Sequence, residues 1–297
     1  SWLHFRGFEV IGTQVNFKGH GQSCSFEIQG GHNILERLAL HDSQAIGVYL
    51  LGGSDNLILN CDAYRNHDFT SEDGRGGNVD GFGGHPSKGS VNNVFRGCRA
   101  WFNSDDGFDF INSGEAAVAE DCWAFYNGFS PRFAPLADGN GFKAGGHAGT
   151  PVARLPNPIP RHVVRGSLAV RNKANGFYAN HHIGGVDFIH NSAARNRANY
   201  NLLGREGDNR TLIPGRGHRL LNNLGFAGGT EVTQLDAAAC EVRGNTWQLT
   251  EFPVAGDFLS LEEAELTRPR RADGGLPEVS FLRLRPGSRL VDRGVET

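Results

Sequence analysis

The stretch Gly97-Cys98-Arg99-Ala100-Trp101-Phe102-Asn103 returns along the chain in a recognisable form. It is preceded by Asn60-Cys61-Asp62-Ala63-Tyr64-Arg65-Asn66 and followed by Asp121-Cys122-Trp123-Ala124-Phe125-Tyr126-Asn127. In each copy a small residue is followed by an alanine two positions later and by an asparagine five positions later. Further copies are Gly166-Ser167-Leu168-Ala169-Val170-Arg171-Asn172, the shorter 191–196, and 36–42, which opens the series. The tightest spacing gives a unit of about 24 residues, and a period of about 20–50 residues indicates a solenoid.

Short apolar runs lie between these copies, such as Val94-Phe95, Val118-Ala119 and Val163-Val164. Their residues alternate rather than recur at helical spacing, which favours strands. The sequence therefore predicts an all-β protein, a parallel β-helix, in which the repeated asparagines form a hydrogen-bonded ladder from coil to coil.

One domain, residues 1–297, accounts for this repeat. We expect residues from about 250 to 297, where the register fades, to form a C-terminal cap, and we expect an N-terminal cap to be missing. Loops rich in Gly, Pro and Arg interrupt the repeat at about 67–79, 129–139, 147–161 and 204–217. Insertions in a solenoid gather on one face, often the binding face, so these loops are either groove walls or ordinary surface loops.

The composition of the chain limits the partners and the cellular location that we expect for it. The net charge of the 297 residues is −3, so we expect no nucleic-acid partner. No apolar run approaches the roughly 20 residues that span a bilayer, so we expect no membrane partner. We also expect a monomer, and a secreted, periplasmic or cell-surface protein whose signal is absent from this chain.

Of the five cysteines, Cys61, Cys98 and Cys122 occupy equivalent repeat positions, and we expect them to be stacked, buried free thiols.

A second theme runs through the same region: Asp80-Gly81-Phe82, Asp106-Gly107-Phe108, Asn140-Gly141-Phe142 and Asn175-Gly176-Phe177. Turn formation by Gly and Asx, with an inward Phe stack, would explain the theme without any function. If the Phe side chains point inward, however, strand alternation turns the next residue outward. We therefore expect an outward column composed of Gly83, Asp109, Lys143 and Tyr178.

Four carboxylates gather on this theme, those of Asp80, Asp105, Asp106 and Asp109. Such a cluster predicts a Ca²⁺ site, because Ca²⁺ takes about 6–8 oxygen ligands; a bare carboxylate pair is the alternative. No His or Cys stands in register, which argues against zinc. A cation beside Lys143 would lower the lysine pKa, as a lysine base requires, whereas the plain alternative is a solvated lysine paired with Asp109.

These linked motifs, 78–82, 103–109 and 139–146, resemble polysaccharide lyase family 9, the pectate lyases and their relatives, over roughly residues 30–230. The resemblance implies a right-handed parallel β-helix, Ca²⁺ bound at Asp80, Asp105, Asp106 and Asp109, and Lys143 as Brønsted base. It implies an acidic pectic polysaccharide as substrate, cleaved by β-elimination. The continuation 173–182 is more similar to the lyases that act on rhamnogalacturonan than to the homogalacturonan enzymes.

Substrate contacts are expected from two sources. Tyr178 would stack on a sugar, and His181 or His182 would contact a carboxylate. Loop arginines, whose guanidinium groups bind carboxylates in a bidentate manner, are Arg75, Arg132, Arg154 and Arg161. Two other functions stay open: a glycoside hydrolase that uses two of the Asp residues as acid and base, and a carbohydrate-binding β-helix without catalysis.

Overall fold

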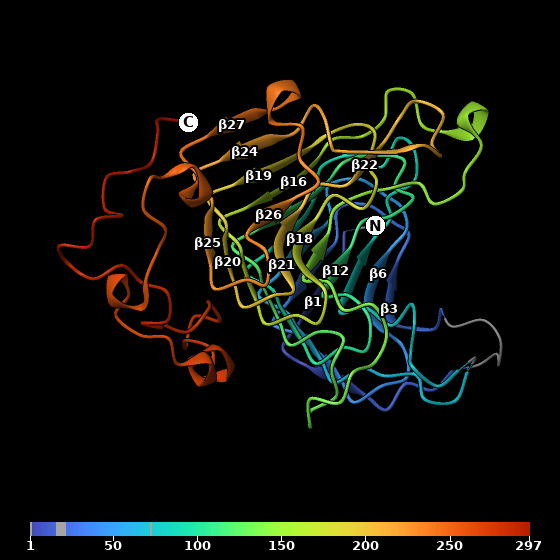
Figure 1. Ribbon diagram of the computed structural model, residues 1–297. Coiled ribbons are helices and arrows are strands. Elements are labelled where there is room, and N and C mark those ends of the chain that lie inside the picture. The colour runs from blue at the N-terminus through green and yellow to red at the C-terminus, as the bar shows by residue number, and fades with distance from the viewer. Residues whose placement is uncertain (1, 16–21, 72) are drawn as a thin grey trace.

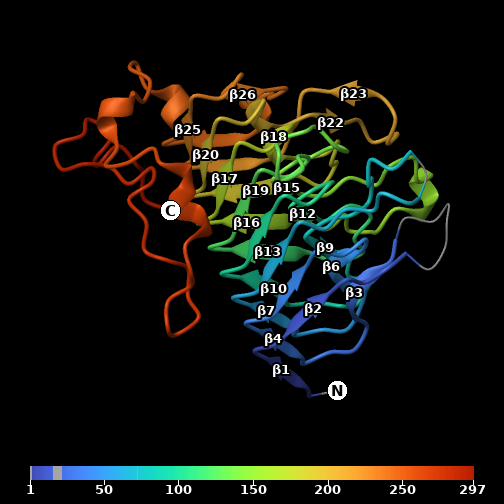
Figure 2. The same cartoon turned by 90° about the horizontal axis from the view of Figure 1, so that it is seen from below.

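The computed structural model describes residues 2–15, 22–71 and 73–297, and these residues form a solenoid of short strands. Three long parallel sheets run along the solenoid, and each coil except the last, which contributes only β27, provides one strand to each sheet (Figure 1). Figure 2 shows the coils stacked in sequence order from the blue N-terminal end. The predicted parallel β-helix is confirmed.

Sheet A has the strand order β1 (His4–Arg6), β4 (Ile34–Glu36), β7 (Leu57–Leu59), β10 (Asn93–Arg96), β13 (Ala117–Glu120), β16 (His162–Arg165), β19 (Val186–Ile189), β24 (Arg219–Leu221) and β27 (Glu241–Arg243). Sheet B follows as β2 (Glu9–Ile11), β5 (Ala39–His41), β8 (Asp62–Tyr64), β11 (Arg99–Trp101), β14 (Trp123–Phe125), β17 (Leu168–Val170), β20 (Ser192–Ala194) and β25 (Leu224–Phe226). Sheet C consists of β3 (Cys24–Ile28), β6 (Ile46–Leu50), β9 (Phe82–Gly84), β12 (Phe108–Asp109), β15 (Phe142–Lys143), β18 (Asn175–Tyr178), β21 (Ala198–Asn201) and β26 (Val232–Thr233).

The remaining elements lie in loops and in the C-terminal region. They are the antiparallel pair β22 (Gly204–Arg205) and β23 (Leu212–Ile213), and the short 3₁₀ helices η1 (Val152–Arg154), η2 (Ala237–Ala239), η3 (Thr246–Gln248), η4 (Ala255–Asp257) and η5 (Glu263–Thr267). None of the helices in the described part of the chain has the length and apolar character that crossing a bilayer requires.

The sequence repeat corresponds to the coil. The repeated alanines pair in register along sheet B, Ala63 with Ala100 and Ala100 with Ala124. The cysteines that precede these strands, Cys61, Cys98 and Cys122, are fully buried free thiols in the core, as expected of small apolar groups.

The predicted asparagine ladder is also present. Asn103 Nδ2 donates to Asn127 Oδ1 at 3.0 Å, and Asn127 Nδ2 donates to Asn172 Oδ1 at 3.0 Å. These asparagines are buried at the corner between sheets B and C, where their amides replace water as partners of the turning backbone.

Stacked aromatic rings fill the core behind sheet C. The centroids of Phe82 and Phe108 are 4.9 Å apart, and those of Phe108 and Phe142 are 4.7 Å apart. The stack continues through Phe177 to Tyr200, with 5.0 Å between these two rings. The inward direction of these rings, which the outward column requires, is confirmed by their complete burial.

The C-terminal segment 250–297 does not cover the end of the solenoid. It packs along the outer face of sheet B, where Phe258, Leu266 and Phe281 join an apolar cluster with Phe125 and Val170. Figure 2 shows this red segment beside the coils rather than beyond them. Its position therefore differs from the end cap that we expected. At the end of sheet B, η3 lies on β25, and Trp247 of η3 packs against Tyr200.

Polar contacts hold the same segment in place. Arg270 Nη2 donates to Asp62 Oδ1 at 2.7 Å, and Arg99 donates to the backbone carbonyl of Leu266 at 3.1 Å. Arg195 Nη1 lies 2.6 Å from Glu263 Oε1, and Tyr126 donates its hydroxyl to Glu263 at 3.0 Å.

Candidate metal and catalytic site

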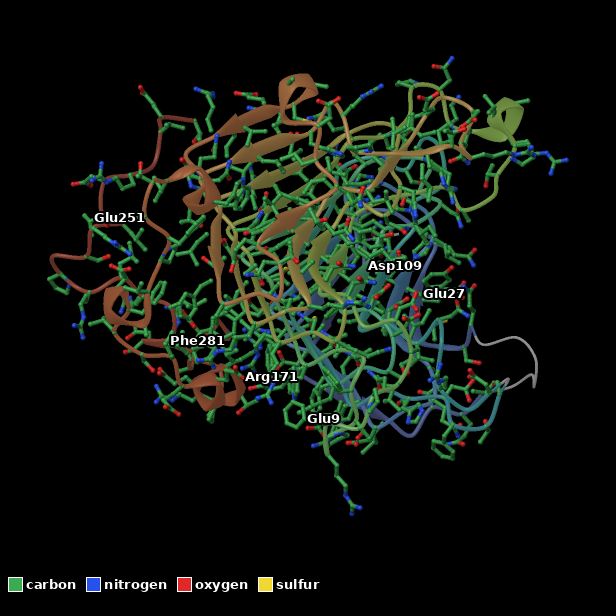
Figure 3. All side chains as sticks on the ribbon, viewed as in Figure 1. Glu9, Glu27, Asp109, Arg171, Glu251 and Phe281 are labelled. Carbon is green, nitrogen blue, oxygen red and sulfur yellow. The ribbon has the colours of Figure 1, made fainter. Side chains whose placement is uncertain are left out.

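The outer face of sheet C carries the predicted column. Gly83 pairs with Asp109, Asp109 with Lys143, and Lys143 with Tyr178. The register extends the column at both ends, giving the order Glu27, Tyr49, Gly83, Asp109, Lys143, Tyr178, Asn201 and Thr233. Figure 3 shows Glu27 and Asp109 on this side of the molecule, with Arg171 and Phe281 on the side of sheet B.

Loops border this column along both edges of sheet C. Residues 67–79 and 129–139 lead into its strands, whereas 147–161 and 204–217 leave from them. The second pair is joined, because Asn209 Nδ2 donates to the carbonyl of Thr150 at 2.9 Å. In Figure 1 η1 and β22 lie above β12 and β6 in the view. The column is therefore flanked by loops at both edges of sheet C.

A second ladder of Asp and Asn side chains sets the carboxylates beside the column. Asp80 Oδ1 accepts from the backbone N–H of Asp106 at 3.0 Å, and Asp106 Oδ1 accepts from both the backbone and side-chain N–H groups of Asn140 at 2.7 Å. Asn175 Nδ2 in turn donates to Asn140 Oδ1 at 2.7 Å. The theme is thus one ladder of side chains that joins successive coils, in which two coils carry a carboxylate in place of an amide. The bend at positive φ that we expected at its glycines is not found; a Cβ atom on Gly81, Gly107 or Gly141 would instead come within 3 Å of an asparagine of the first ladder.

Asp80, Asp106 and Asp109 form one compact cluster. One carboxylate oxygen from each lies within 4.8 Å of the others, and all three residues are buried. Asp109 Oδ1 also accepts from the backbone N–H of Ile111 at 2.7 Å, which fixes its orientation. The carboxylates are therefore held by the backbone and point toward one another.

Lys143 forms ion pairs with two carboxylates of the cluster. Its Nζ lies 3.0 Å from Asp109 Oδ2 and 3.1 Å from Asp106 Oδ2. The lysine side chain is 14% exposed, whereas that of Asp106 is completely buried. The ammonium therefore lies on the more exposed side of the cluster.

Burial and mutual repulsion determine the protonation of these groups. Burial, and then the charges of Asp109, Asp105 and Asp106, raise the pKa of Asp80 well above its usual range. Burial also raises the pKa of Asp106, an effect that Lys143 opposes. For Lys143, burial lowers the pKa, but the four carboxylates together outweigh it and raise the pKa above the usual value. Beside the carboxylates alone, Lys143 is therefore held in its protonated form. This upward shift of its pKa is opposite to the downward shift that we expected beside a cation.

The cluster fits a hard divalent cation. Asp106 Oδ2 is buried and accepts no hydrogen bond from any described residue, although Lys143 is near. Carboxylate oxygens are the ligands that Ca²⁺ prefers, and a cation would compensate the charge that raises the pKa of Asp80 and Asp106. Asp80, Asp106 and Asp109 are the residues that would hold it.

Asp105 has a different environment from the other three. Its Oδ2 accepts from the backbone N–H of Asn78 at 2.7 Å, and its Oδ1 accepts from the backbone N–H of Asp138 at 3.0 Å. These donors belong to the loops 67–79 and 129–139, so Asp105 ties both loops to β12. Burial and the charge of Asp106 raise its pKa to about 8. Asp105 adjoins the compact cluster rather than forming part of it.

The three predicted side chains after Lys143 separate into two groups. Tyr178 follows Lys143 in the column, and its hydroxyl lies 3.3 Å from His181 Nδ1. His182 is buried, accepts from the backbone N–H of Gly146 at 3.0 Å, and has its Nε2 2.7 Å from the carbonyl of Pro160. Both ring nitrogens of His182 are therefore used inside the protein, which disfavours the predicted contact with a substrate carboxylate.

The loop arginines are likewise divided. Arg75, Arg132 and Arg154 are exposed, each on a loop that borders sheet C. Arg161 instead lies 2.6 Å from Asp187 and also donates to the carbonyl of Gly217 at 2.7 Å, so its guanidinium is already occupied.

Tyr49 and His85 were not expected at the site. Tyr49 belongs to the column, and the ring of His85 lies edge-on to it, with 5.0 Å between their centroids. No motif identified them, because Tyr49 precedes the Asp/Asn theme and the loop 67–79 separates it from Gly83 in the sequence.

Comparisons with known proteins agree with this architecture. A family model described as "Pel9A-like, right handed beta helix region" matches residues 1–211. The chain is 35% identical over 300 residues to a pectate lyase L of Dickeya chrysanthemi and 36% identical over 298 residues to a pectate lyase L of Dickeya dadantii. These alignments cover 99% and 98% of this chain but only 63% and 64% of the two relatives.

Two solved structures are similar along nearly the whole chain. A rhamnogalacturonan lyase superposes with a TM-score of 0.90 at 46% identity, covering 95% of this chain and 70% of that one. The crystal structure of pectate lyase Pel9A gives a TM-score of 0.77 at 33% identity, covering 99% of this chain and 66% of that one. The chain therefore belongs to the Pel9A-like family of right-handed parallel β-helix proteins.

Proposed function

We propose that this protein is a calcium-dependent polysaccharide lyase that cleaves galacturonate-containing pectic polymers by β-elimination. The observation that carries the proposal is the position of Lys143 Nζ, 3.0 and 3.1 Å from two members of a buried three-carboxylate cluster on sheet C. The relatives named pectate lyase and rhamnogalacturonan lyase support the same class of reaction. Because such polymers lie outside cells, we propose a secreted or cell-surface location and a monomer.

The reaction needs a base at the carbon next to the uronate carboxylate. Neutral Lys143 Nζ takes the proton from that carbon, the electrons of the C–H bond form a carbon–carbon double bond, and the glycosidic C–O bond breaks. The departing oxygen takes up a proton, so the products are one unsaturated and one saturated chain end. A Ca²⁺ ion held by Asp80, Asp106 and Asp109, with Asp105 adjoining, would stabilise negative charge on the uronate carboxylate and offset the field that keeps Lys143 protonated.

Other residues position the substrate. Tyr178 and His181 lie one rung beyond Lys143, where the polymer would continue along the column. Arg75 and Arg132 are exposed on the loops beside Asp105 and would bind further uronate carboxylates. We propose the alternating rhamnose–galacturonate backbone as the preferred polymer, supported by the 46% identity to a rhamnogalacturonan lyase.

A hydrolase reading is less compatible with this geometry. Asp106 is completely buried, and Asp105 has both oxygens bound to backbone N–H groups. Asp109 accepts from Ile111 N–H and is paired with Lys143, so none of the three is a free carboxylate on the surface. The deciding experiment incubates the protein with rhamnogalacturonan, polygalacturonate and a neutral xylan, with Ca²⁺ or with chelator. We expect ultraviolet-absorbing unsaturated ends from the uronate polymers in Ca²⁺ only. Saturated products would support a hydrolase, and binding without any cleavage would support a non-catalytic module.

A further inference from the structure

The strand that carries Lys143 is short and leads directly into two glycines. β15 ends at Lys143, and Ala144 donates its N–H to the carbonyl of Tyr178 at 2.8 Å. Gly145 and Gly146 come next, with φ values of 115° and 88°. Glycine has no Cβ atom and the widest choice of backbone conformations, so the chain at this point needs other contacts to hold a single conformation.

Two side chains of the next coil and one N–H group of the previous coil hold these glycines. Asn180 Nδ2 donates to the carbonyl of Gly145 at 2.7 Å, and His182 Nδ1 accepts from the N–H of Gly146 at 3.0 Å. The carbonyl of Gly146 accepts from the N–H of Asn112 at 2.8 Å. A Cβ atom on Gly145 would lie 2.6 Å from His182 Nδ1, so the close approach of the imidazole requires glycine there.

His182 also holds the far end of the loop that begins at these glycines. Its Nε2 lies 2.7 Å from the carbonyl of Pro160, and the loop 147–161 connects Gly146 to this proline. The ring is almost completely buried. One imidazole therefore fastens the backbone where it leaves β15 and where it returns to the coils.

The two hydrogen bonds define the protonation state of His182. A backbone N–H only donates and a carbonyl only accepts, so Nδ1 is unprotonated and Nε2 carries the hydrogen. Burial, together with the charges of His147 and Arg161, lowers the pKa of His182 to about 4, and the ring is neutral near neutral pH. A proton on Nδ1 would set two donors against each other at Gly146 and break that bond.

The ionisable groups that face His182 offer no compensation for such a proton. Within the described residues they are imidazoles and one guanidinium: His147 and His162, with ring centroids 5.6 and 5.2 Å from that of His182, then His218 and Arg161. None of the ion pairs formed in the described part of the chain includes His182. The surroundings therefore favour the neutral ring, the only form that accepts from Gly146.

We propose that His182 is a positioning residue, whose imidazole fixes the backbone after Lys143 and thereby holds the lysine amine at the carboxylate cluster. The proposal rests on the proposed lyase function, in which Lys143 is the base. The bond to Gly146 bears on the reaction because it lies three residues beyond the lysine, whereas the bond to Pro160 secures the loop. A displacement of about 1 Å at a reacting group can cost about 100-fold in rate, so loss of this anchor should lower kcat.

Two variants separate the two bonds. His182→Asn places an amide oxygen near the position of Nδ1, where it can accept from Gly146, but it is too short to reach Pro160. His182→Gln reaches Pro160 with its amide N–H and leaves Gly146 without an acceptor. The positioning role therefore predicts that His182→Asn rescues the reaction and that His182→Gln does not.

The first arm measures kcat and KM for unsaturated-product formation from rhamnogalacturonan at saturating Ca²⁺. His182→Gln should lower kcat about tenfold or more and change KM less than about threefold, because the anchor acts on the base rather than on polymer binding. His182→Asn should keep kcat within about threefold of the wild type. His218→Gln, which removes the equivalent acceptor of the Val186 N–H, is the matched control and should lower the melting temperature without lowering kcat.

The second arm needs no turnover and follows hydrogen exchange of the amides in 143–146. At neutral pH these amides should exchange about tenfold faster in His182→Gln than in the wild type, and at nearly the wild-type rate in His182→Asn. As the pH falls toward 4, their exchange in the wild type should rise relative to His182→Asn, whose side chain does not titrate.

Thermal melting of each variant shows that the comparison is made between folded proteins. Equal loss of kcat in His182→Asn and His182→Gln, or an unchanged kcat in His182→Gln, would overturn the positioning role and leave the lyase function intact. A wild-type protein that forms no unsaturated product would overturn the lyase function. The exchange arm would then decide the anchor by itself, and equal exchange in His182→Gln and the wild type would overturn it.

Discussion

Lys143 Nζ lies 3.0 Å from Asp109 Oδ2 because β15 and β12 pair these two residues directly across the sheet, although 34 residues separate them in the chain. The same ammonium reaches Asp106 Oδ2 at 3.1 Å. One lysine thus contacts two carboxylates of the cluster, and its protonation depends on what else neutralises them. This dependence leads to the first two predictions.

Lys143→Ala should lower the rate of unsaturated-product formation by about 10²–10⁴-fold, the usual contribution of a positioned base. Lys143→Arg should lose nearly as much near neutral pH, because a guanidinium stays protonated there. The rates of both variants are measured at saturating Ca²⁺ across a pH series. A substantially active Lys143→Ala would remove this residue from the mechanism, and a partly active Lys143→Arg would indicate an electrostatic role.

Asp106→Asn should abolish most of the thermal stabilisation that Ca²⁺ gives. A cation present at 100 times its dissociation constant stabilises the native state by about 2.7 kcal/mol, provided that the unfolded chain does not bind it. Without Ca²⁺ the variant should be at least as stable as the wild type at neutral pH, because burial raises the Asp106 pKa and its ionised form is unfavourable in the folded protein. Melting curves with Ca²⁺, with Mg²⁺ and with chelator check both statements. An unchanged Ca²⁺ response in Asp106→Asn would contradict the metal site.

Buried histidines should make the protein sensitive to acid. Burial lowers the pKa of both His182 and His218 to about 4, whereas an unfolded histidine titrates near 6.5. The unfolded state therefore binds more protons between these values, so stability is complete above about pH 6.5 and is lost as the pH falls toward 4. At pH 5 the loss is on the order of 2 kcal/mol for each histidine.

His218→Asn isolates this effect, because its side-chain oxygen can still accept the backbone N–H of Val186 that His218 Nδ1 accepts at 3.1 Å. Urea unfolding at pH 7 and pH 5 should show a smaller loss of stability on acidification in His218→Asn than in the wild type. The comparison between the two proteins cancels the opposite contribution of Asp80 and Asp106, whose raised pKa values favour the folded state in acid. Identical pH dependence in the two proteins would contradict the prediction.

Glu263 should anchor the C-terminal segment to sheet B. Its carboxylate lies 2.6 Å from Arg195 and accepts from Tyr126 at 3.0 Å, and these partners would be left with an unmatched charge and hydroxyl in Glu263→Ala. Because Arg195 is 35% exposed, we expect a loss of only about 1–3 kcal/mol in the free energy of unfolding. Faster hydrogen exchange in 258–290, with unchanged exchange in sheet C, is the expected pattern. Glu262→Ala, the exposed neighbour, is the control.

The sequence alone determined the fold and the outward column. The alanine and asparagine positions of each coil repeat because every coil faces the same neighbours above and below, so the equivalent residues reveal the stacking. The inward Phe stack and strand alternation then place Asp109 beside Lys143 without any coordinates. The role of Lys143 and the identity of a bound ion remain predictions.

Only the tertiary structure decided which side chains share one environment. It joined Asp80, Asp106 and Asp109 in a compact cluster, turned Asp105 toward the backbone of two loops, and buried His182. It also placed Tyr49 at the column and the segment 250–297 against sheet B. These outcomes depend on loop lengths and on packing between distant segments, neither of which follows the sequence repeat. They also depend on hydrogen bonds to individual backbone N–H groups, which cannot be read from residue types. Periodicity reveals what every coil shares, whereas the site is built from the positions at which the coils differ.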